Sequence, residues 1–181
     1  MDAPRLKPLP PPYSAKAQAM LDALLPDGMP VLNIFATVAH NPRVLERMLA
    51  GGLLDKGSIS LADRELVILR SCARCRAEYE WGVHVAGFAA AAGLSREQVE
   101  DTVCQAIDPN LWTDKQRCLI GCVDALHERQ SIPDTLWARL AEHYADDQLV
   151  EIVMLAGLYH AVSFVVNALR VDHEPSAPRF P

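Results

Sequence analysis

Residues 60–94 read SLADRELVILRSCARCRAEYEWGVHVAGFAAAAGL, and this stretch decides the fold. Its apolar residues recur every three or four positions, which predicts two helices over residues 61–75 and 78–92. Only a very short connection around Arg76 separates them. Because a short connection forces consecutive helices side by side, we expect an antiparallel helical hairpin.

The rest of the chain shows the same helical character. Aromatic residues make up only 6% of the 181 residues and apolar residues recur at helical spacing, so strand signals are scarce. Helix starts are marked by Ser60, Ser95 and Thr113, each three residues before an acid or amide. We therefore predict an all-α fold. The other predicted helices cover residues 14–25, 31–40, 43–50, 96–106, 114–129, 134–144 and 147–169.

A chain of this length, half of it hydrophobic, is long enough for one domain with its own core. Residues 1–13 are rich in proline, which predicts an extended arm that packs on a neighbour. Residues 14–170 form the predicted helical domain. Residues 171–181 are polar and proline-rich, so we expect this tail to leave the core.

Charge and cysteine usage narrow the class of protein. Lys and Arg total 17 against 23 for Asp and Glu, and the formal charge of −6 argues against a nucleic-acid partner. The five cysteines are odd in number and lie mostly in helical segments, unlike a secreted disulfide scaffold. The N-terminus has no apolar run typical of a signal peptide. We expect a cytoplasmic protein.

Residues 152–169, IVMLAGLYHAVSFVVNAL, are nearly long enough to cross a bilayer, which takes about 20 apolar residues. His160, Ser163 and Asn167 interrupt the run. We therefore expect the central helix of a soluble core, or an oligomer seam, and no membrane partner. The polar side chains, together with Tyr159, must find hydrogen-bond partners there, either among themselves and the backbone or by lining a pocket.

Glu80 and His84 are four residues apart and therefore share one helix face, which is otherwise apolar. A carboxylate beside an imidazole in apolar surroundings can exchange a proton, as acid–base catalysis requires. The alternative is an ordinary surface pair. Glu65, in RELVILR, is a second candidate acid, and its alternative role is to complement the helix dipole.

Cys72 and Cys75 form a CxxC pair that suggests thiol–disulfide chemistry. Both lie in the last turn of the predicted helix 61–75, where the dipole raises a thiol pKa, so the position argues against it. A zinc site from these cysteines, Glu80 and His84 has suitable ligand types but lacks two separated ligand pairs. We expect no metal.

Tyr79 and His160 remain possible pocket residues. Tyr79 precedes Glu80 and lies on a different face of the predicted helix. We therefore favour a position in the wall of a pocket or in the core over a reacting role. The remaining histidines stand in no informative pattern. They are His40, His127, His143 and His173.

With Glu65, the short connection and EYEWGVH in view, the chain resembles the carboxymuconolactone decarboxylase and alkylhydroperoxidase D superfamily. The resemblance covers about residues 31–170 and is densest over 60–94. It implies an AhpD-like helical bundle with the site on a central hairpin, in a homo-oligomer such as a dimer, trimer or hexamer.

The two branches of the superfamily differ at the thiols. The peroxidase branch has CxxC ending four residues before the site His, and here those positions hold Ala77 and Glu80. The cysteines lie five residues earlier. The decarboxylase branch, which uses no cofactor, has a Glu four residues before the His. The resemblance thus implies that Glu80 and His84 act as acid and base while Glu65 orients or relays.

We therefore expect a cofactor-free acid–base enzyme for a small carboxylated lactone or related organic acid. A thiol peroxidase using Cys72 and Cys75 is the first alternative. A non-catalytic oligomeric protein that binds a small molecule is the second.

Overall fold

The hairpin of residues 61–84 stands at the centre of an all-helical chain. The computed structural model describes residues 3–25 and 29–181, which contain no strand. Between α5 and α6 the chain makes a π-helical turn, Val85–Ala89, and a short 3-10 turn precedes α7. The α-helices are α1 (Ala15–Leu24), α2 (Asn33–Val38), α3 (Pro42–Ala50), α4 (Leu61–Arg74), α5 (Glu78–His84), α6 (Arg96–Asp101), α7 (Asp114–Arg129), α8 (Asp134–Ala141) and α9 (Asp146–Leu169).

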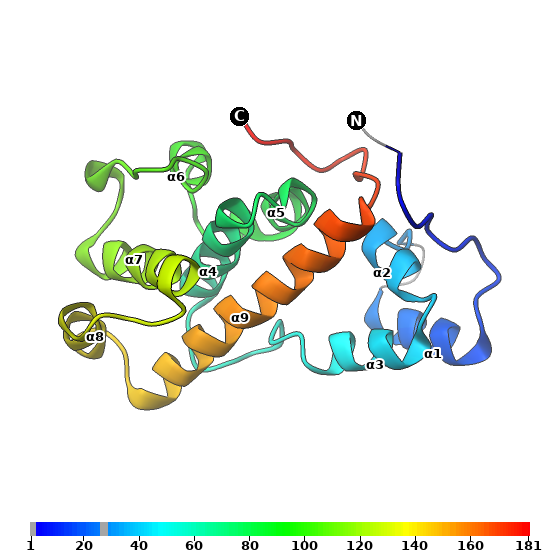
Figure 1. The fold of residues 1–181 in the computed structure, drawn as a ribbon, viewed down its shortest axis with the longest axis horizontal. Helices are drawn as coiled ribbons and strands as arrows, with labels where there is room; N and C mark the ends of the chain where they lie inside the picture. Colours follow the sequence, from blue (N-terminus) through cyan, green and yellow to red (C-terminus); the bar gives the residue numbers. More distant parts are fainter. Residues whose placement is uncertain (1–2, 26–28) are drawn as a thin grey trace.

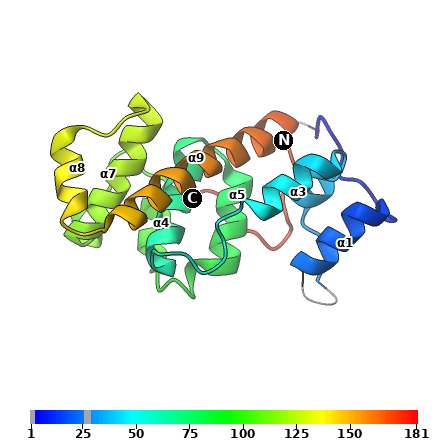
Figure 2. The ribbon, with the colours of Figure 1, turned by 90° about the horizontal axis from the view of Figure 1, so that it is seen from below.

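Helix α4 is the central element of the fold. Its contacts with α7 and with α9 are the most extensive between any two elements. The aliphatic run from Leu66 to Leu69 is at most 1% exposed, which explains why this helix carries apolar residues around most of its circumference. Helix α9 runs across the molecule, with α7 and α8 at one end and α1, α2 and α3 at the other (Figures 1 and 2). The all-α prediction is confirmed.

The predicted hairpin is confirmed, with α4 ending at Arg74 and α5 beginning at Glu78. Arg76 takes a positive φ of 55°, which turns the chain sharply enough for the two helices to contact each other. The helix predicted over 78–92 is confirmed as far as Ala89, although its second part is not α-helical. There the α-helix stops at His84 and a π-helical turn follows, a feature that often marks functional sites.

The predicted helix starts are confirmed at the hydroxyl residues. Ser60 accepts a hydrogen bond from the Asp63 backbone, and Ser95 and Thr113 form capping boxes with the glutamines three residues later. The helix predicted over 96–106 is too long, since α6 ends at Asp101. The carboxylate of Asp101 instead accepts hydrogen bonds from the Asp108 backbone and the Trp112 indole, which bring the following loop back over the helix.

The N-terminal arm packs on its own chain. Its Arg5 backbone N–H donates to Leu169, and its Leu9 N–H donates to Ala36. The described arm residues therefore lie along the end of α9 and beside α2. Of the predicted arm, residues 1–2 lie outside the described residues.

The C-terminal tail does not leave the core as the sequence suggested. Phe180 packs edge-on against the buried Trp81, with ring centroids 5.2 Å apart, and its backbone N–H donates to Glu78. Glu174 accepts a 2.6 Å hydrogen bond from the Tyr79 hydroxyl. Low hydropathy predicted a solvated tail, but these specific aromatic and charged contacts hold it across α5.

Helix α9 is long and apolar enough to cross a membrane, judged by length and composition alone. In this fold 44% of its most apolar stretch is buried, and it packs on α4 and α5. Its polar side chains find partners, as predicted: Ser163 donates to the Tyr159 carbonyl and Asn167 to that of Cys75. Its outer face leaves Val150, Met154 and Phe164 exposed.

A buried ion pair joins the two central helices α4 and α7. Arg70, only 1% exposed, donates to both carboxylate oxygens of Asp124 at 2.7 Å and to the carbonyls of Thr102 and Cys104. Every part of the buried guanidinium is thereby matched to an acceptor, which compensates for its desolvation.

The Asp124→Ala variant is expected to lower the free energy of unfolding by about 2 kcal/mol, because it leaves Arg70 buried without its counter-charge. The expected loss of stability is smaller than for a fully buried pair, because the Asp124 side chain is 27% exposed and solvent screens its charge. Urea unfolding at pH 7 measures it. The matched control is Glu128→Ala, since Glu128 pairs with Arg74 at the more exposed edge. An equal loss in both variants would contradict this account.

Candidate active site

The site is built where α4, α5 and α9 meet. Glu65 lies in the second turn of α4 and His84 is the last residue of α5. Their side chains meet at 2.8 Å, between Glu65 Oε2 and His84 Nδ1. The other ring nitrogen, Nε2, lies 2.9 Å from the Tyr159 hydroxyl on α9. The histidine ring is thus held from both sides.

Arg64 and Phe88 complete the surroundings of this pair. The Arg64 guanidinium contacts the other oxygen of Glu65, with Nε at 2.9 Å and the terminal nitrogen at 2.8 Å. It also lies over the Phe88 ring, which in turn packs against His84 with centroids 5.2 Å apart. Glu65 therefore stands between two cations and has no exposed surface.

Glu80 lies one helical turn before His84 on α5. Its Oε1 is 3.5 Å from His84 Nε2, on the same side of the ring as Tyr159. Its Oε2 is buried and has no hydrogen-bond partner among the described residues. Buried polar atoms without partners are uncommon, so this oxygen is an acceptor suited to a bound molecule.

The electrostatics of the site favour a charged imidazole. Burial opposes protonation of His84, but the hydrogen bonds and negative charges of Glu65 and Glu80 outweigh it and raise the pKa of His84 to about 9. At neutral pH the ring is an imidazolium that donates Nδ1–H to Glu65 and Nε2–H to Tyr159. This is a proton donor next to a free carboxylate oxygen.

Sequence reasoning missed the part that Tyr159 plays. Burial, and then the nearby Glu80 carboxylate, raise the pKa of the Tyr159 hydroxyl well above its usual range, so it stays protonated. One indication of this role is present in the sequence: Tyr159 lies on the most apolar helix, where its hydroxyl needs a buried hydrogen-bond partner. Only the packing of α9 on the hairpin shows that the partner is His84.

The two cysteines of the CxxC pair are free thiols with different surroundings. Burial raises the pKa of Cys72 well above its usual range, and the nearby Glu80 carboxylate adds to the effect. Cys75, at the C-cap of α4, is half-buried, and burial raises its pKa as well. Neither environment favours the thiolate that a redox thiol needs.

Tyr79 and His160 lie outside the Glu65–His84 contact. The Tyr79 hydroxyl accepts from the Ile34 backbone and donates to Glu174, so it holds α2 and the tail. Tyr79 does line a surface hollow, which lies between α5 and the end of α9. His160 points toward α7, where its Nε2 lies 3.0 Å from Nδ1 of His127.

The site is nearly closed in a single chain. Glu65 is 0% exposed, His84 2% and Glu80 7%. Of the three, Glu80 is therefore the most accessible to solvent. A second hollow, apolar and lined by residues of α7, α8 and α9, lies away from them.

Donor atoms that could hold a metal converge at two places in the described chain, and neither includes Glu65 or His84. One group is Cys75, His127 and His160, and the other is Asp114, Cys118 and His143. The zinc set considered from the sequence, which combined the CxxC pair with Glu80 and His84, is not among them.

The chain is an all-helical protein in which a buried carboxylate and imidazole from the helical hairpin meet a hydroxyl from α9. Residues 41–119 match the Carboxymuconolactone decarboxylase family. That segment contains Glu65, Glu80 and His84, and the resemblance to the carboxymuconolactone decarboxylase and alkylhydroperoxidase D superfamily is therefore confirmed. No curated protein matches the chain significantly.

Solved structures share the fold at low sequence identity. A peroxidase-related protein from Silicibacter sp. TM1040 is 16% identical with a TM-score of 0.79, covering 100% of this chain and 95% of that one. An alkylhydroperoxidase AhpD core protein from Ralstonia eutropha JMP134 is 15% identical with a TM-score of 0.78, covering 94% and 93%. The debrominase Bmp8 with 2,3,4-tribromopyrrole is 15% identical with a TM-score of 0.69, covering 94% and 92%.

Proposed function

We propose that this protein is a cofactor-free acid–base enzyme that acts on a small carboxylated lactone or a related organic acid. The observation that carries the proposal is the buried His84 ring, held between Glu65 and Tyr159 and lying beside Glu80, whose Oε2 has no partner among the described residues. A proton donor and a free carboxylate side by side in a buried site are the two groups that proton transfer requires.

The proposed reaction is decarboxylation with proton delivery to carbon. The bond between the substrate carbon and its carboxylate breaks, carbon dioxide leaves, and the electron pair is delocalised into the lactone carbonyl. His84 then gives its Nε2 proton to that carbon. Glu80, the most exposed of the three residues, passes a proton from solvent back to the imidazole 3.5 Å away. One proton enters and one carbon dioxide leaves in each turnover.

Glu65 is a positioning residue in this scheme. Its hydrogen bond to Nδ1 fixes the ring orientation and keeps that nitrogen protonated, so the transferable proton is the one on Nε2. Arg64 holds Glu65 in turn. The Tyr159 hydroxyl accepts from Nε2–H and orients it until substrate takes its place as the acceptor.

The Glu80→Gln variant tests the proposal. Carbon dioxide release from a panel of small carboxylated lactones is expected to fall about 10²-fold, because the amide cannot return a proton to His84. The matched control is Glu78→Gln, the same change two residues earlier, where the carboxylate pairs with Arg179 instead. The control is expected to keep full turnover.

The alternatives give different results in the same assay. A protein that only binds its ligand would turn over no lactone and would keep its ligand affinity in Glu80→Gln and His84→Ala variants. Either finding would overturn the acid–base proposal.

A thiol oxidoreductase is the second candidate, because two of the structural neighbours are described as peroxidase-related. It would use Cys72 and Cys75, which would be oxidised to a disulfide as a hydroperoxide is reduced to an alcohol and water. The buried, protonated Cys72 opposes it. A peroxide-dependent disulfide, with activity lost in Cys75→Ser, would favour this reading over decarboxylation.

We further propose a cytoplasmic homo-oligomer with no membrane or nucleic-acid partner. The acidic net charge supports the absence of a nucleic-acid partner. The exposed side chains of Val150, Met154 and Phe164 on α9 support the homo-oligomer, because the same face of a second copy would cover them.

A further inference from the structure

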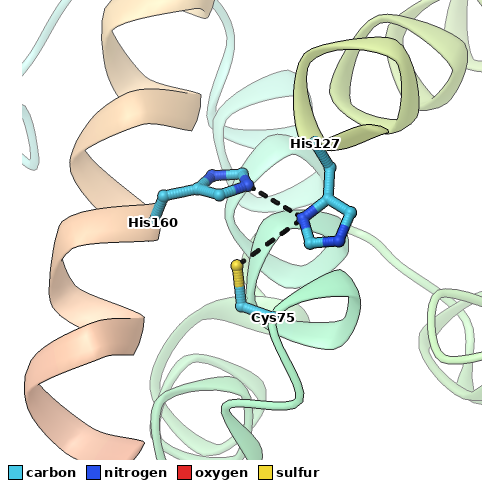
Figure 3. A group of neighbouring side chains, drawn as sticks. All are labelled: Cys75, His127 and His160. Atoms are coloured by element: carbon cyan, nitrogen blue, oxygen red, sulfur yellow. Dashed lines mark hydrogen bonds between the residues drawn. The ribbon is translucent and has the colours of Figure 1, made fainter. Parts of the chain in front are cut away.

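Three side chains from three different helical segments converge beside α9, where His160 follows Tyr159 in sequence. Cys75 lies at the C-cap of α4, His127 near the end of α7, and His160 in the middle of α9. Figure 3 shows the sulfur and the two rings pointing toward one another. Their donor atoms all lie within 4.8 Å of one another.

The orientation of His160 is fixed by the backbone. Its Nδ1 lies 2.7 Å from the Ala156 carbonyl, so Nδ1 carries a proton and donates it. In the neutral ring, Nε2 then presents a lone pair to the other two side chains. A backbone carbonyl on the distal nitrogen is the arrangement that typically orients a metal-binding histidine.

Without an ion, hydrogen bonds satisfy this cluster only in part. The two imidazoles share one proton across the 3.0 Å between His127 Nδ1 and His160 Nε2. The Cys75 sulfur has only weak hydrogen-bonding contacts, with the Ser163 hydroxyl and with His127 Nδ1 at 3.9 Å. A cation at the centre would engage all three donors at once.

The separations fit a tetrahedral ion after small side-chain movements. Zinc distances of about 2.3 Å to sulfur and 2.0–2.1 Å to nitrogen place adjacent ligand atoms roughly 3.3 to 3.6 Å apart. The observed 3.0 Å and 3.9 Å lie on either side of this range. Rotation of the half-buried Cys75 side chain accounts for the remaining adjustment.

We propose that Cys75, His127 and His160 bind a divalent metal ion of the zinc type, with the fourth position open to solvent. One thiolate and two imidazoles suit borderline-soft ions such as Zn²⁺ and Co²⁺ and exclude the oxygen-seeking Mg²⁺ and Ca²⁺. Three protein ligands, all partly exposed, define an open site. The ion would tie together α4, α7 and α9 and would lie outside the acid–base site.

The second convergent group makes a useful comparison. Asp114 in that group is already bound by Arg139 at 2.6 Å, Arg117 at 3.2 Å and His143 at 3.1 Å. Its carboxylate would have to leave two guanidinium groups to take a cation. His143 is therefore a matched histidine that the proposed site does not need.

The test is metal binding by the full chain. After treatment with a chelator, the protein is expected to take up one equivalent of Zn²⁺ with a dissociation constant below about 1 µM. Added Co²⁺ is expected to give a thiolate-to-metal charge-transfer band and the strong visible absorption of tetrahedral coordination. The His160→Gln and Cys75→Ser variants are expected to weaken binding by more than about 100-fold.

The His143→Gln variant is the control and is expected to bind as the parent does. Circular dichroism checks that each variant folds. Failure of the parent chain to bind either ion would overturn the proposal, as would loss of binding in His143→Gln with retention in His160→Gln. Neither result depends on lactone turnover, so the proposed function stands or falls separately.

A second readout follows from the position of the site between helices. Zn²⁺ at 100 times its dissociation constant is expected to raise the melting temperature of the parent chain by about 5 to 10 °C. It is also expected to slow alkylation of Cys75 while leaving the exposed Cys104 reactive. Equal protection of both thiols would contradict binding at this cluster.

Discussion

The His84→Gln variant is expected to lose about 10³-fold in lactone turnover, the largest effect of any single change at the site. Glutamine fills much of the same space and still accepts and donates hydrogen bonds, but it carries no transferable proton. The loss should appear in kcat rather than KM, because the Nε2 proton is delivered only as the reaction proceeds.

His143→Gln is the matched control for this change. His143 lies on the surface of the far end of the molecule, paired with Asp114, and its loss is expected to leave turnover unchanged. A decrease of less than about tenfold in His84→Gln would remove His84 from the chemistry.

The pH dependence of the parent enzyme supplies a further check on the same residue. Burial disfavours the imidazolium, but Glu65 and Glu80 raise the pKa of His84 to about 9, so the proton donor is present at neutral pH and disappears above that value. Turnover is therefore expected to fall on the alkaline side with a midpoint near pH 9. A midpoint near pH 6.5, the value of an unperturbed histidine, would contradict the geometry described for Glu65.

The shared site of Glu65 and His84 was indicated by the family resemblance, and the predicted hairpin agrees with it. The short connection at Arg76 sets α4 and α5 side by side, so residues at comparable distances from the turn come together. Glu80 followed from its spacing of four to His84. These residues are close together in sequence, and helical periodicity predicts such local relations well.

The contributions of other segments could not be anticipated in this way. Tyr159 reaches His84 from a helix 75 residues away in sequence. No residue pattern in the sequence indicated the π-helical turn after His84. Phe180 in the tail has low local hydropathy around it, yet Trp81 provides it with an aromatic partner.

The Cys75–His127–His160 cluster shows the same limit. Its members come from α4, α7 and α9, so no ligand spacing links them in the sequence, and His127 stood in no informative pattern. A search for paired ligands around CxxC instead led to Glu80 and His84. Only the packing of α7 and α9 on α4 brings the imidazoles to Cys75.

The second large effect is expected from Glu65→Gln, which should lower the free energy of unfolding by about 3 to 5 kcal/mol at pH 6. Glu65 is fully buried and contacts both Arg64 and His84. Its neutralisation leaves two cations facing each other without the carboxylate between them. Glutamine keeps the size of the side chain. The loss of stability would therefore come from the missing charge and not from a cavity.

This loss should depend on pH in a defined direction. The folded-state pKa of His84 is about 9, the outcome of burial that lowers it and carboxylates that raise it more, whereas an unfolded histidine has about 6.5. The stability that the proton confers is therefore complete below about pH 6.5 and is lost as the pH rises through 9. The difference between parent and variant should shrink over that interval, without vanishing, because Arg64 remains charged.

Urea unfolding at pH 6, 7.5 and 9.5 measures this difference, and NMR titration of the His84 ring measures its pKa in both proteins. In Glu65→Gln the ring is expected to titrate well below 9, because burial then acts against its charge with less opposition. The control is Glu46→Gln, an exposed carboxylate paired with Lys16, which is expected to show no measurable change. If the two proteins differed by the same amount at all three pH values, Glu65 would stabilise the fold without holding the His84 proton, and the proton donor at the centre of the proposed mechanism would need another origin.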